Sequence, residues 1–262
     1  MQQPLTRLSS ILMKKVDKGS SEPIESEASV SVILPTYNEQ GNIVQLVRKL
    51  KGLLAGTPKE IIIVDDDSPD GTAQLVRDAF ADDGEVRLIV RHENRGLANS
   101  IREGIESTSG EMIVVIDSDG NHQPEDVVTL LHVTNHVDIV VGSRFIYGGG
   151  MTNLFHYYLS YLFNIFIRLA TGSRLDDNLS GFFSIHRKKL FALDFDKIFW
   201  GYGDYFFRLL LLCQRHGFRL VEIPVFYGER KHGISKTNFF LVFVRYTGEI
   251  LRIVLLRLLN KW

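Results

Sequence analysis

The sequence contains little cysteine and no long apolar run. Its single cysteine, Cys213, excludes an internal disulfide and lies in an apolar helical pattern, so we expect a buried, unreactive thiol. No segment reaches the ~18–20 uninterrupted apolar residues that span a bilayer. Residues 11–13 are apolar but precede two lysines, the reverse of the order in a secretory signal. These absences predict an intracellular protein that is not integral to the membrane.

The sequence also lacks the common nucleotide-binding fingerprints. It has no G-x-x-x-x-G-K-[ST] loop, and no G-x-G-x-x-G follows the first predicted strand. Basic residues do not gather in one dense run with interleaved aromatics, so a nucleic acid is not an expected partner. With 45% apolar and 23% charged residues over 262 positions, the chain is instead suited to one large folded core.

Charge is unevenly distributed along the chain, although the net charge is −1. Residues 1–143 carry 13 Lys and Arg against 23 Asp and Glu, whereas residues 144–262 carry 17 against 8. An acidic half that can bind a metal, next to a basic half, suits an anionic substrate held between them.

Apolar periodicity predicts alternating strands and helices after a flexible tail at residues 1–29. Strands are expected at 30–34, 60–64, 86–90, 112–116 and 138–141, and helices at 42–54, 73–80, 96–107 and 124–131. Alternation of this kind predicts an α/β fold, with a mostly parallel sheet that has helices on both faces.

Two further stretches, 153–170 and 238–262, are dense in Phe, Tyr, Leu and Ile and contain few charges. A helix that is apolar over most of its circumference either belongs to a core or lies in a membrane interface. The pattern leaves both readings open for 153–170. Aromatic and cationic residues near its end favour the interface for 238–262.

Polar clusters follow the predicted strands. Asp117-Ser118-Asp119 comes directly after an apolar run, and side chains two residues apart on a strand point the same way. The two carboxylates could converge on one divalent cation and on a diphosphate, although an ordinary turn also uses Asp-x-Asp. Another strand ends in Gly142-Ser143-Arg144, which offers a guanidinium to phosphate.

The second predicted strand leads into Asp65, Asp66 and Asp67, followed by Ser68-Pro69-Asp70-Gly71-Thr72. Three consecutive acids repel one another unless they are solvated or find donors, such as ribose hydroxyls or a base N–H. The alternative is an Asp-rich turn and helix cap, which we expect for Asp70.

These motifs resemble the motif series of inverting family-2 glycosyltransferases with the GT-A (Rossmann-like) fold, and more narrowly of the dolichol-phosphate or polyprenol-phosphate mannose synthases. The resemblance covers about residues 30–240. It rests on Pro35-Thr36-Tyr37-Asn38-Glu39, Val64 with the following acids, Asp117-Ser118-Asp119, Gly142-Ser143-Arg144, Ser180-Gly181-Phe182, Gly201-Tyr202 and Arg230-Lys231-His232-Gly233-Ile234-Ser235-Lys236.

The resemblance implies a role for each matching position. The base and ribose of a nucleotide would be held by Pro35, Tyr37, Glu39, Val64 and Asp66. The sugar, the diphosphate and a Mg²⁺ or Mn²⁺ ion would be bound by Asp117, Ser118 and Asp119, with Asp119 a direct metal ligand. Asn121 would be the second metal ligand, on a shorter arm than the Gln that is usual in the family. The donor diphosphate and the acceptor phosphate would be surrounded by Arg144, Arg230 and Lys236, although a solvated basic loop is the alternative for the last two.

The implied reaction is metal-assisted transfer of a hexose, expected to be mannose from GDP-mannose, to a polyprenyl (dolichyl or undecaprenyl) phosphate with inversion. Asp117, Asp119, Arg144, Arg230 and Lys236 would form the catalytic set. A GT-A domain at 30–237, including an interfacial helix at 153–170, would be followed by an amphipathic membrane-associated helix at 238–262. The protein would sit peripherally on the cytoplasmic face of a membrane, and the sequence gives no support for a membrane subunit.

Two alternatives remain open from the sequence. One is transfer to a saccharide hydroxyl, which needs a base, and Asp204 is the candidate unless it only caps the helix that follows. The other is a non-catalytic nucleotide-sugar-binding protein, which the shorter Asn121 would suit.

Overall fold

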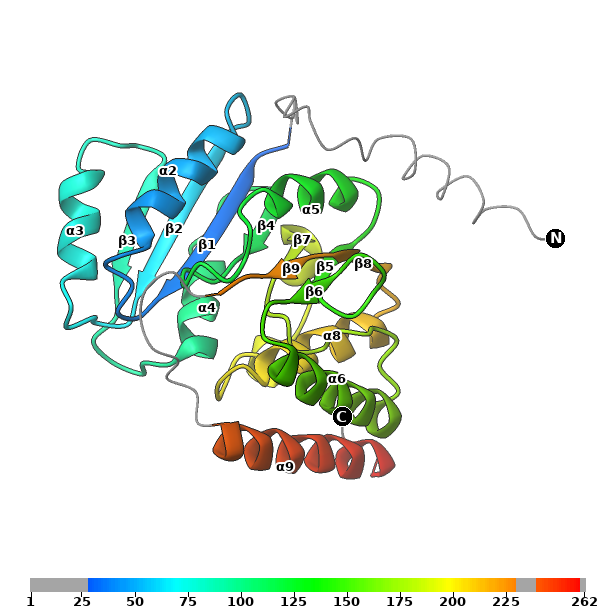
Figure 1. The fold of residues 1–262 in the computed structure, drawn as a ribbon. Helices are drawn as coiled ribbons and strands as arrows, with labels where there is room; N and C mark the ends of the chain where they lie inside the picture. Colours follow the sequence, from blue (N-terminus) through cyan, green and yellow to red (C-terminus); the bar gives the residue numbers. More distant parts are fainter. Residues whose placement is uncertain (1–27, 230–238, 260–262) are drawn as a thin grey trace.

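A central seven-stranded sheet organises the computed structural model, which describes residues 28–229 and 239–259 (Figure 1). Its strands run in the order β3-β2-β1-β4-β7-β5-β8. Their bounds are β1 Val30–Thr36, β2 Lys59–Asp65, β3 Val86–Val90, β4 Met112–Val115, β5 Ile139–Ser143, β7 Phe183–His186 and β8 Leu220–Pro224. All neighbours pair in parallel except β7, which is antiparallel to both β4 and β5.

The five strands predicted from the sequence are all present, and the expected mostly parallel α/β sheet is confirmed. The strand predicted at 86–90 has the bounds observed for β3, and the others differ by two residues or fewer at either end. The sequence analysis did not anticipate β7 or β8. It also missed a small parallel pair formed by β6 (Gly150–Met151) and β9 (Phe226–Tyr227).

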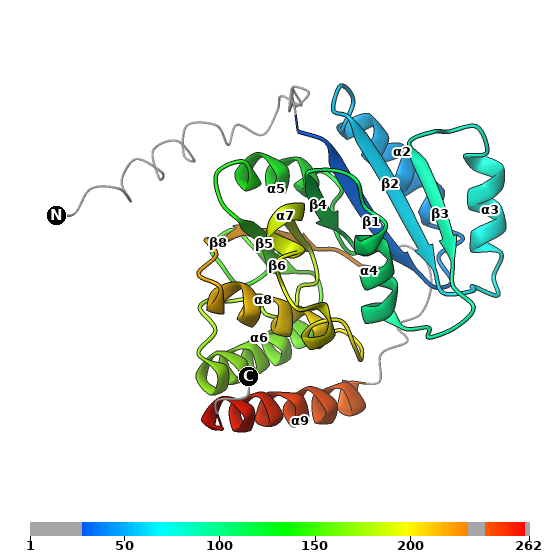
Figure 2. The same ribbon diagram turned by 180° about the vertical axis from the view of Figure 1, so that it is seen from behind.

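Helices cover both faces of the sheet (Figures 1 and 2). On one face, α2 (Ile43–Leu53), α3 (Thr72–Ala79) and α5 (Asp126–Thr134) share a core with Val32 and Leu34 of β1. On the other, α4 (Leu97–Glu106), α7 (Arg187–Leu190), the 3-10 helix η1 (Phe195–Lys197) and α8 (Tyr205–Arg215) share a core with Ile33. Successive residues of one strand therefore enter different cores, which explains why its apolar run is continuous rather than alternating.

The contact between α4 and the sheet is unusually close at Gly104. A Cβ atom at this position would lie 2.6 Å from Ile33 Cγ2 and 3.1 Å from Val64 Cγ2, so a larger residue would push the helix away. The absent side chain lets α4 lie directly against Ile33 in the middle of β1 and Val64 near the end of β2.

The two long apolar helices are present as α6 (Leu154–Thr171) and α9 (Phe239–Leu258), and α9 lies against α6. The Asn153 side chain caps α6 by accepting a hydrogen bond from the His156 backbone N–H at 3.0 Å. In α9, Ile250 and Ile253 are buried against the protein. Within the described ranges, every helix is too short or too polar to pass through a bilayer.

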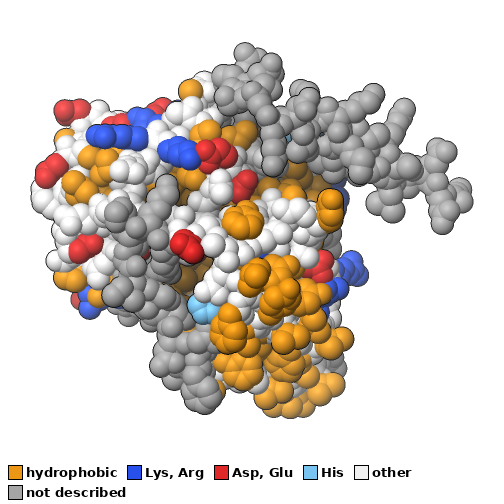
Figure 3. Space-filling view, in the orientation of Figure 1, with side chains coloured by type: hydrophobic (Ala, Val, Ile, Leu, Met, Phe, Trp, Pro, Cys, Tyr) orange, Lys and Arg blue, Asp and Glu red, His pale blue; other side chains and the backbone are white. Residues whose placement is uncertain are grey.

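Both α6 and α9 also expose a hydrophobic surface. The most exposed of these side chains are Leu154, Phe155, Tyr158, Leu162 and Leu169 on α6, with Phe243, Val244, Leu251, Leu255 and Leu258 on α9. Figure 3 shows hydrophobic side chains gathered over α6. We call these ten residues the α6–α9 patch. Monomeric soluble proteins rarely leave a patch of this kind uncovered.

Candidate functional site

The carboxyl ends of β1, β2, β4 and β5 meet at one edge of the sheet, as parallel strands require. Pro35 and Val64 are register partners on β1 and β2. Proline fits in β1 because the ladder with β4 stops at Ile33, so no backbone N–H is needed there. The Ser118 hydroxyl donates to the Pro35 carbonyl at 2.7 Å. These contacts bring together the polar clusters that follow β1, β2 and β4.

The loop after β1 carries an exposed aromatic ring beside a buried acid. The Tyr37 side chain is 42% exposed, as a ring that stacks on a nucleotide base would need to be. Glu39 is buried, and its carboxylate accepts a hydrogen bond from Asn42 Nδ2 at 2.8 Å. The Glu39 backbone N–H donates to Thr72 Oγ1 at 3.0 Å, which ties this loop to the loop after β2.

The three consecutive acids at the end of β2 all find partners within the protein. Asp65 accepts hydrogen bonds from the Ser68 backbone N–H at 2.8 Å and from its hydroxyl at 2.6 Å. Asp67, in a left-handed conformation with φ of 55°, lies 3.6 Å from the Arg95 guanidinium. Asp70 accepts from Thr72 N at 3.0 Å, so its predicted role as a turn residue is confirmed.

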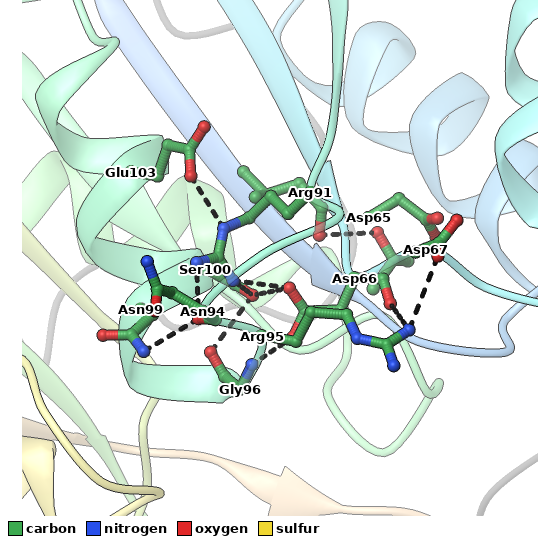
Figure 4. A network of polar contacts seen from close by, with 12 residues as sticks. Asp65, Asp66, Asp67, Arg91, Asn94, Arg95, Gly96, Asn99, Ser100 and Glu103 are labelled. Carbon is green, nitrogen blue, oxygen red and sulfur yellow. Dashed lines mark hydrogen bonds and ion pairs between the residues drawn. The ribbon is translucent and has the colours of Figure 1, made fainter.

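Asp66 is the centre of the network in Figure 4. Its carboxylate accepts from Arg91 Nη1 at 2.6 Å, Ser100 Oγ at 2.7 Å and the Gly96 backbone N–H at 2.6 Å. Arg91 also pairs with Glu103 of α4 at 2.7 Å. The sequence analysis expected donors from a nucleotide, but the donors found come from the protein. A carboxylate has about four acceptor sites, so a nucleotide contact by Asp66 stays a prediction.

The Asp117-Ser118-Asp119 loop begins where β4 ends. Asp117 keeps a side chain that is 37% exposed, whereas Ser118 and Asp119 are buried. Asp119 accepts hydrogen bonds from the Asn121 backbone N–H at 3.0 Å and from Asn121 Nδ2 at 2.9 Å. The two residues predicted as metal ligands are therefore adjacent in space.

The chemistry of this loop fits Mg²⁺ or Mn²⁺, which prefer carboxylate and amide oxygens. No group of three or more His, Cys, Asp or Glu side chains arranged for a metal occurs in the part of the chain that the structure describes. Magnesium commonly uses one or two carboxylates and completes its shell with water and substrate phosphates. Asp119 offers one carboxylate for that arrangement, and Asn121 would add its carboxamide oxygen once the amide, whose nitrogen faces Asp119 in this structure, turns over.

Arg144 follows β5 and is held by a partner that the sequence analysis missed. Its guanidinium is bound in a fork by buried Asp177, with Nε–Oδ2 and Nη2–Oδ1 distances of 2.8 Å. Burial alone would lower the pKa of Arg144, but Asp177, with smaller contributions from Tyr227 and Asp117, raises it. Arg144 is thus a fixed, permanently charged cation beside the acidic loop.

Glu222 of β8 fixes the backbone that carries Asp177. Its carboxylate accepts the backbone N–H groups of Asp176 and Asp177, each at 2.8 Å. The segment that carries Asp177 lies 33 residues beyond Arg144 and has no apolar period that would place it at the sheet edge. Sequence patterns offered no signal for either acid.

Tyr227 links several parts of the site. Its hydroxyl donates to the Ser180 carbonyl at 2.7 Å, and the Arg144 guanidinium lies 4.6 Å from the centre of its ring. The ring also touches the imidazole of His122, with centroids 4.3 Å apart. The Gly228 backbone N–H donates to the Asn121 carbonyl at 2.9 Å, which brings the end of β9 to the acidic loop. The sequence analysis named Arg144, Asn121 and the Ser180 motif, but it did not identify Tyr227, His122 or Gly228.

Arg230 and Lys236, the remaining predicted cations, lie outside the described residues. Neither expected role for Asp204 matches the structure. Its side chain makes no capping hydrogen bond to α8, and it is fully buried, with an ion pair to Arg208 Nη1 at 2.7 Å and a hydrogen bond from the Tyr202 backbone N–H at 2.7 Å. A substrate hydroxyl cannot reach a carboxylate enclosed in this way.

The chain is similar to proteins of known activity. A family model described as glycosyl transferase family 2 matches residues 31–193. A dolichol-phosphate mannosyltransferase of Pyrococcus furiosus is 32% identical over 239 residues, which is 86% of this chain and, at 66%, just under two thirds of that protein. An undecaprenyl-phosphate mannosyltransferase of Micrococcus luteus is 34% identical over 219 residues, covering 80% of this chain and 87% of that protein.

The fold is also found in a solved structure. Glucosyl-3-phosphoglycerate synthase of Mycobacterium tuberculosis, in complex with Mn²⁺, UDP and glucosyl-3-phosphoglycerate, superposes with a TM-score of 0.62 at 22% identity, over 89% of this chain and 80% of that one. At this identity the likeness shows a common fold. It confirms the GT-A architecture expected from the motifs.

Proposed function

The chain belongs to glycosyl transferase family 2, and from that premise we propose that it transfers a hexose from a nucleotide-sugar donor to a polyprenyl phosphate, with inversion at the anomeric carbon. The relatives from Pyrococcus furiosus and Micrococcus luteus carry dolichol-phosphate and undecaprenyl-phosphate in their names, which supports a lipid phosphate acceptor. Both are mannosyltransferases, so we propose mannose, carried by GDP-mannose, as the donor sugar.

The α6–α9 patch is the observation that carries this proposal. A polyprenyl phosphate presents its phosphate at the level of the lipid headgroups, so an enzyme that uses it must work against an apolar surface. On α9, one side is buried against the protein at Ile250 and Ile253, while Leu251 and Leu255 are 59% and 57% exposed. We propose that α6 and α9 lie in the membrane interface, on the cytoplasmic face, and hold the protein there peripherally.

The enclosure of Asp204 also favours a phosphate over a hydroxyl acceptor. A phosphate monoester is ionised near neutral pH and needs no base, whereas a sugar hydroxyl must lose a proton. The acid that the sequence offered as a base is fully buried and paired with Arg208. The proposed reaction therefore needs orientation and charge neutralisation more than proton transfer.

In the proposed reaction, an acceptor phosphate oxygen bonds to the anomeric carbon while the bond from that carbon to the donor diphosphate breaks. The electron pair leaves with the nucleoside diphosphate. Arg144, fixed by Asp177, stabilises the developing negative charge, and we assign Arg230 and Lys236 to the donor diphosphate and the acceptor phosphate. A Mg²⁺ or Mn²⁺ ion held by Asp119 and Asn121 would supply further Lewis-acid stabilisation of that charge.

Transfer of radiolabel from GDP-mannose to undecaprenyl or dolichyl phosphate, in detergent with Mg²⁺ or Mn²⁺, tests the function. We expect a lipid-soluble product from the full chain and none from Asp119→Asn. A product formed with a UDP-sugar but not with GDP-mannose would overturn the assignment of mannose as the donor sugar. The proposed transfer to a lipid phosphate would stand. Absence of a lipid-soluble product with every donor tried would overturn the proposal.

Flotation with liposomes tests the proposed membrane contact separately. The double variant Leu162→Ser, Leu169→Ser changes two exposed leucines of α6, and Phe191→Ser changes an exposed aromatic residue outside both helices. We expect the first to lose most liposome binding and the second to retain it. Equal binding by the wild type and the α6 variant would contradict an interfacial role for this patch.

A further inference from the structure

His122 is buried beside the acidic loop without a hydrogen-bond partner. Its side chain is 1% exposed, and no described residue forms a hydrogen bond with either Nδ1 or Nε2. Leaving a buried polar group unpaired is costly, and most native structures avoid it. A buried imidazole without a hydrogen bond therefore calls for a functional explanation within the site.

The ring is fixed by its neighbours. Its centroid lies 4.6 Å from that of Phe182 and 4.3 Å from that of Tyr227, which meets it edge to face. The preceding residue, Asn121, is tied to Gly228 by a 2.9 Å backbone hydrogen bond. The imidazole therefore has little freedom to reorient toward another hydrogen-bond partner.

Among the described residues, Asp117 is the carboxylate within ion-pair distance of this ring. The distance from His122 Nε2 to Asp117 Oδ2 is 3.5 Å, slightly longer than a normal hydrogen bond. The Asp117 side chain is 37% exposed, so it can still adjust its position. A small rotation of this carboxylate toward the ring would close the hydrogen bond.

We propose that His122 is a positioning residue for Asp117. Its Nε2–H donates to Asp117 Oδ2 when the donor sugar is bound, which leaves Oδ1 oriented toward the sugar. A carboxylate held by one oxygen loses less rotational freedom on binding substrate. This inference rests on the proposed function, because it assigns Asp117 to the sugar rather than to the nucleotide.

Three substitutions separate the hydrogen bond from the packing. Phe in His122→Phe fills the space against Phe182 and Tyr227 but has no donor. The amide nitrogen of His122→Gln falls close to the position of Nε2, whereas that of His122→Asn falls close to Nδ1. Only the glutamine variant should therefore restore a donor to Asp117.

We expect His122→Phe to lower kcat for mannosyl transfer to undecaprenyl phosphate by about 10- to 100-fold, the usual effect of losing one hydrogen bond to a charged group. His122→Gln should recover most of the activity that His122→Phe loses, and His122→Asn should resemble the phenylalanine variant. In an Asp117→Asn background, His122→Phe should have little further effect, because its partner has lost its charge.

Calorimetry gives a second readout that does not depend on turnover. His122→Phe should weaken binding of GDP-mannose and leave binding of GDP unchanged, since GDP carries no sugar. Equal loss for both ligands, equal rescue by Asn and Gln, or an undiminished effect in the Asp117→Asn background would overturn the inference. If the wild type makes no lipid-linked product, the proposed function fails, while the difference between GDP-mannose and GDP still tests His122.

Discussion

Replacing Asp177 with asparagine should destabilise the protein far more than the same change at Asp176, its neighbour in the chain. Both side chains pair with an arginine, and Glu222 binds both backbone N–H groups at 2.8 Å. The two variants thus share the substitution, the segment and the backbone anchorage. They differ in the burial of the ion pair, and the Asp177 carboxylate also accepts the backbone N–H groups of Arg144 at 3.1 Å and Leu179 at 3.2 Å.

The burial of each ion pair sets the expected loss in the free energy of unfolding. The Asp177 side chain is 0% exposed and its partner Arg144 is 7% exposed, and breaking a buried pair from one side costs about 3–5 kcal/mol. Asparagine keeps the shape and one acceptor, so we expect a loss of about 2–4 kcal/mol. Asp176 and Arg168 are 37% and 41% exposed, and exposed pairs contribute about 0–1 kcal/mol.

Urea unfolding of Asp177→Asn and Asp176→Asn, analysed with a common slope, measures both losses. Raising the salt concentration should remove the small effect at Asp176 and leave most of the effect at Asp177, because buried charges are poorly screened. Transfer activity should fall with Asp177→Asn, because Arg144 loses its fixed orientation. Losses in unfolding free energy that agree within about 0.5 kcal/mol would refute the reasoning from burial.

Three further variants test separate features. Burial raises the pKa of Asp126 to about 6, so its ionisation destabilises the folded state as pH rises through that value, and Asp126→Asn should stabilise the protein by about 1–2 kcal/mol near neutral pH but not near pH 4. Burial also raises the pKa of Glu60, but hydrogen bonds from Ser31 and other neighbours outweigh it and hold the pKa at about 2. Its contribution is therefore present above about pH 4.5 and lost as pH falls toward 2, so Glu60→Gln should cost about 1–3 kcal/mol by chemical unfolding near neutral pH and little near pH 2. Asp204→Asn should lose about 2–4 kcal/mol through its pair with Arg208 while keeping its turnover per folded molecule, and a large loss of kcat without loss of stability would make Asp204 a catalytic group after all.

The acidic half of the fold could be read from the sequence because its signals are local. A buried strand such as Met112–Val115 is a run of apolar residues that needs no knowledge of its neighbours. Once the strands are taken as parallel, Asp117 and Arg144 must fall at the same edge of the sheet, and the structure places them there. The parallel arrangement of the strands is the reason that motifs far apart in the sequence could be predicted to form one site.

The parts of the fold and of the site that the sequence did not predict depend on contacts between distant segments. Phe183–His186 is a short run with no clear period, and its place between β4 and β5 is decided by pairing. Asp177 and Arg144 meet across 33 residues, and the partners that enclose His122 come from β9 and from the residue before β7. Local patterns carry no information about such encounters.

The antiparallel strand β7 has a consequence for the order in which this protein can fold. The segment through β5 contains every predicted strand, yet β4 and β5 are joined through β7, which begins at residue 183. A nascent chain that has not yet reached β7 would expose the unpaired edges of two hydrophobic strands, a form prone to associate with other chains. We therefore expect that the segment through β5 is not an autonomous folding unit, and that a fragment cut after residue 145 aggregates.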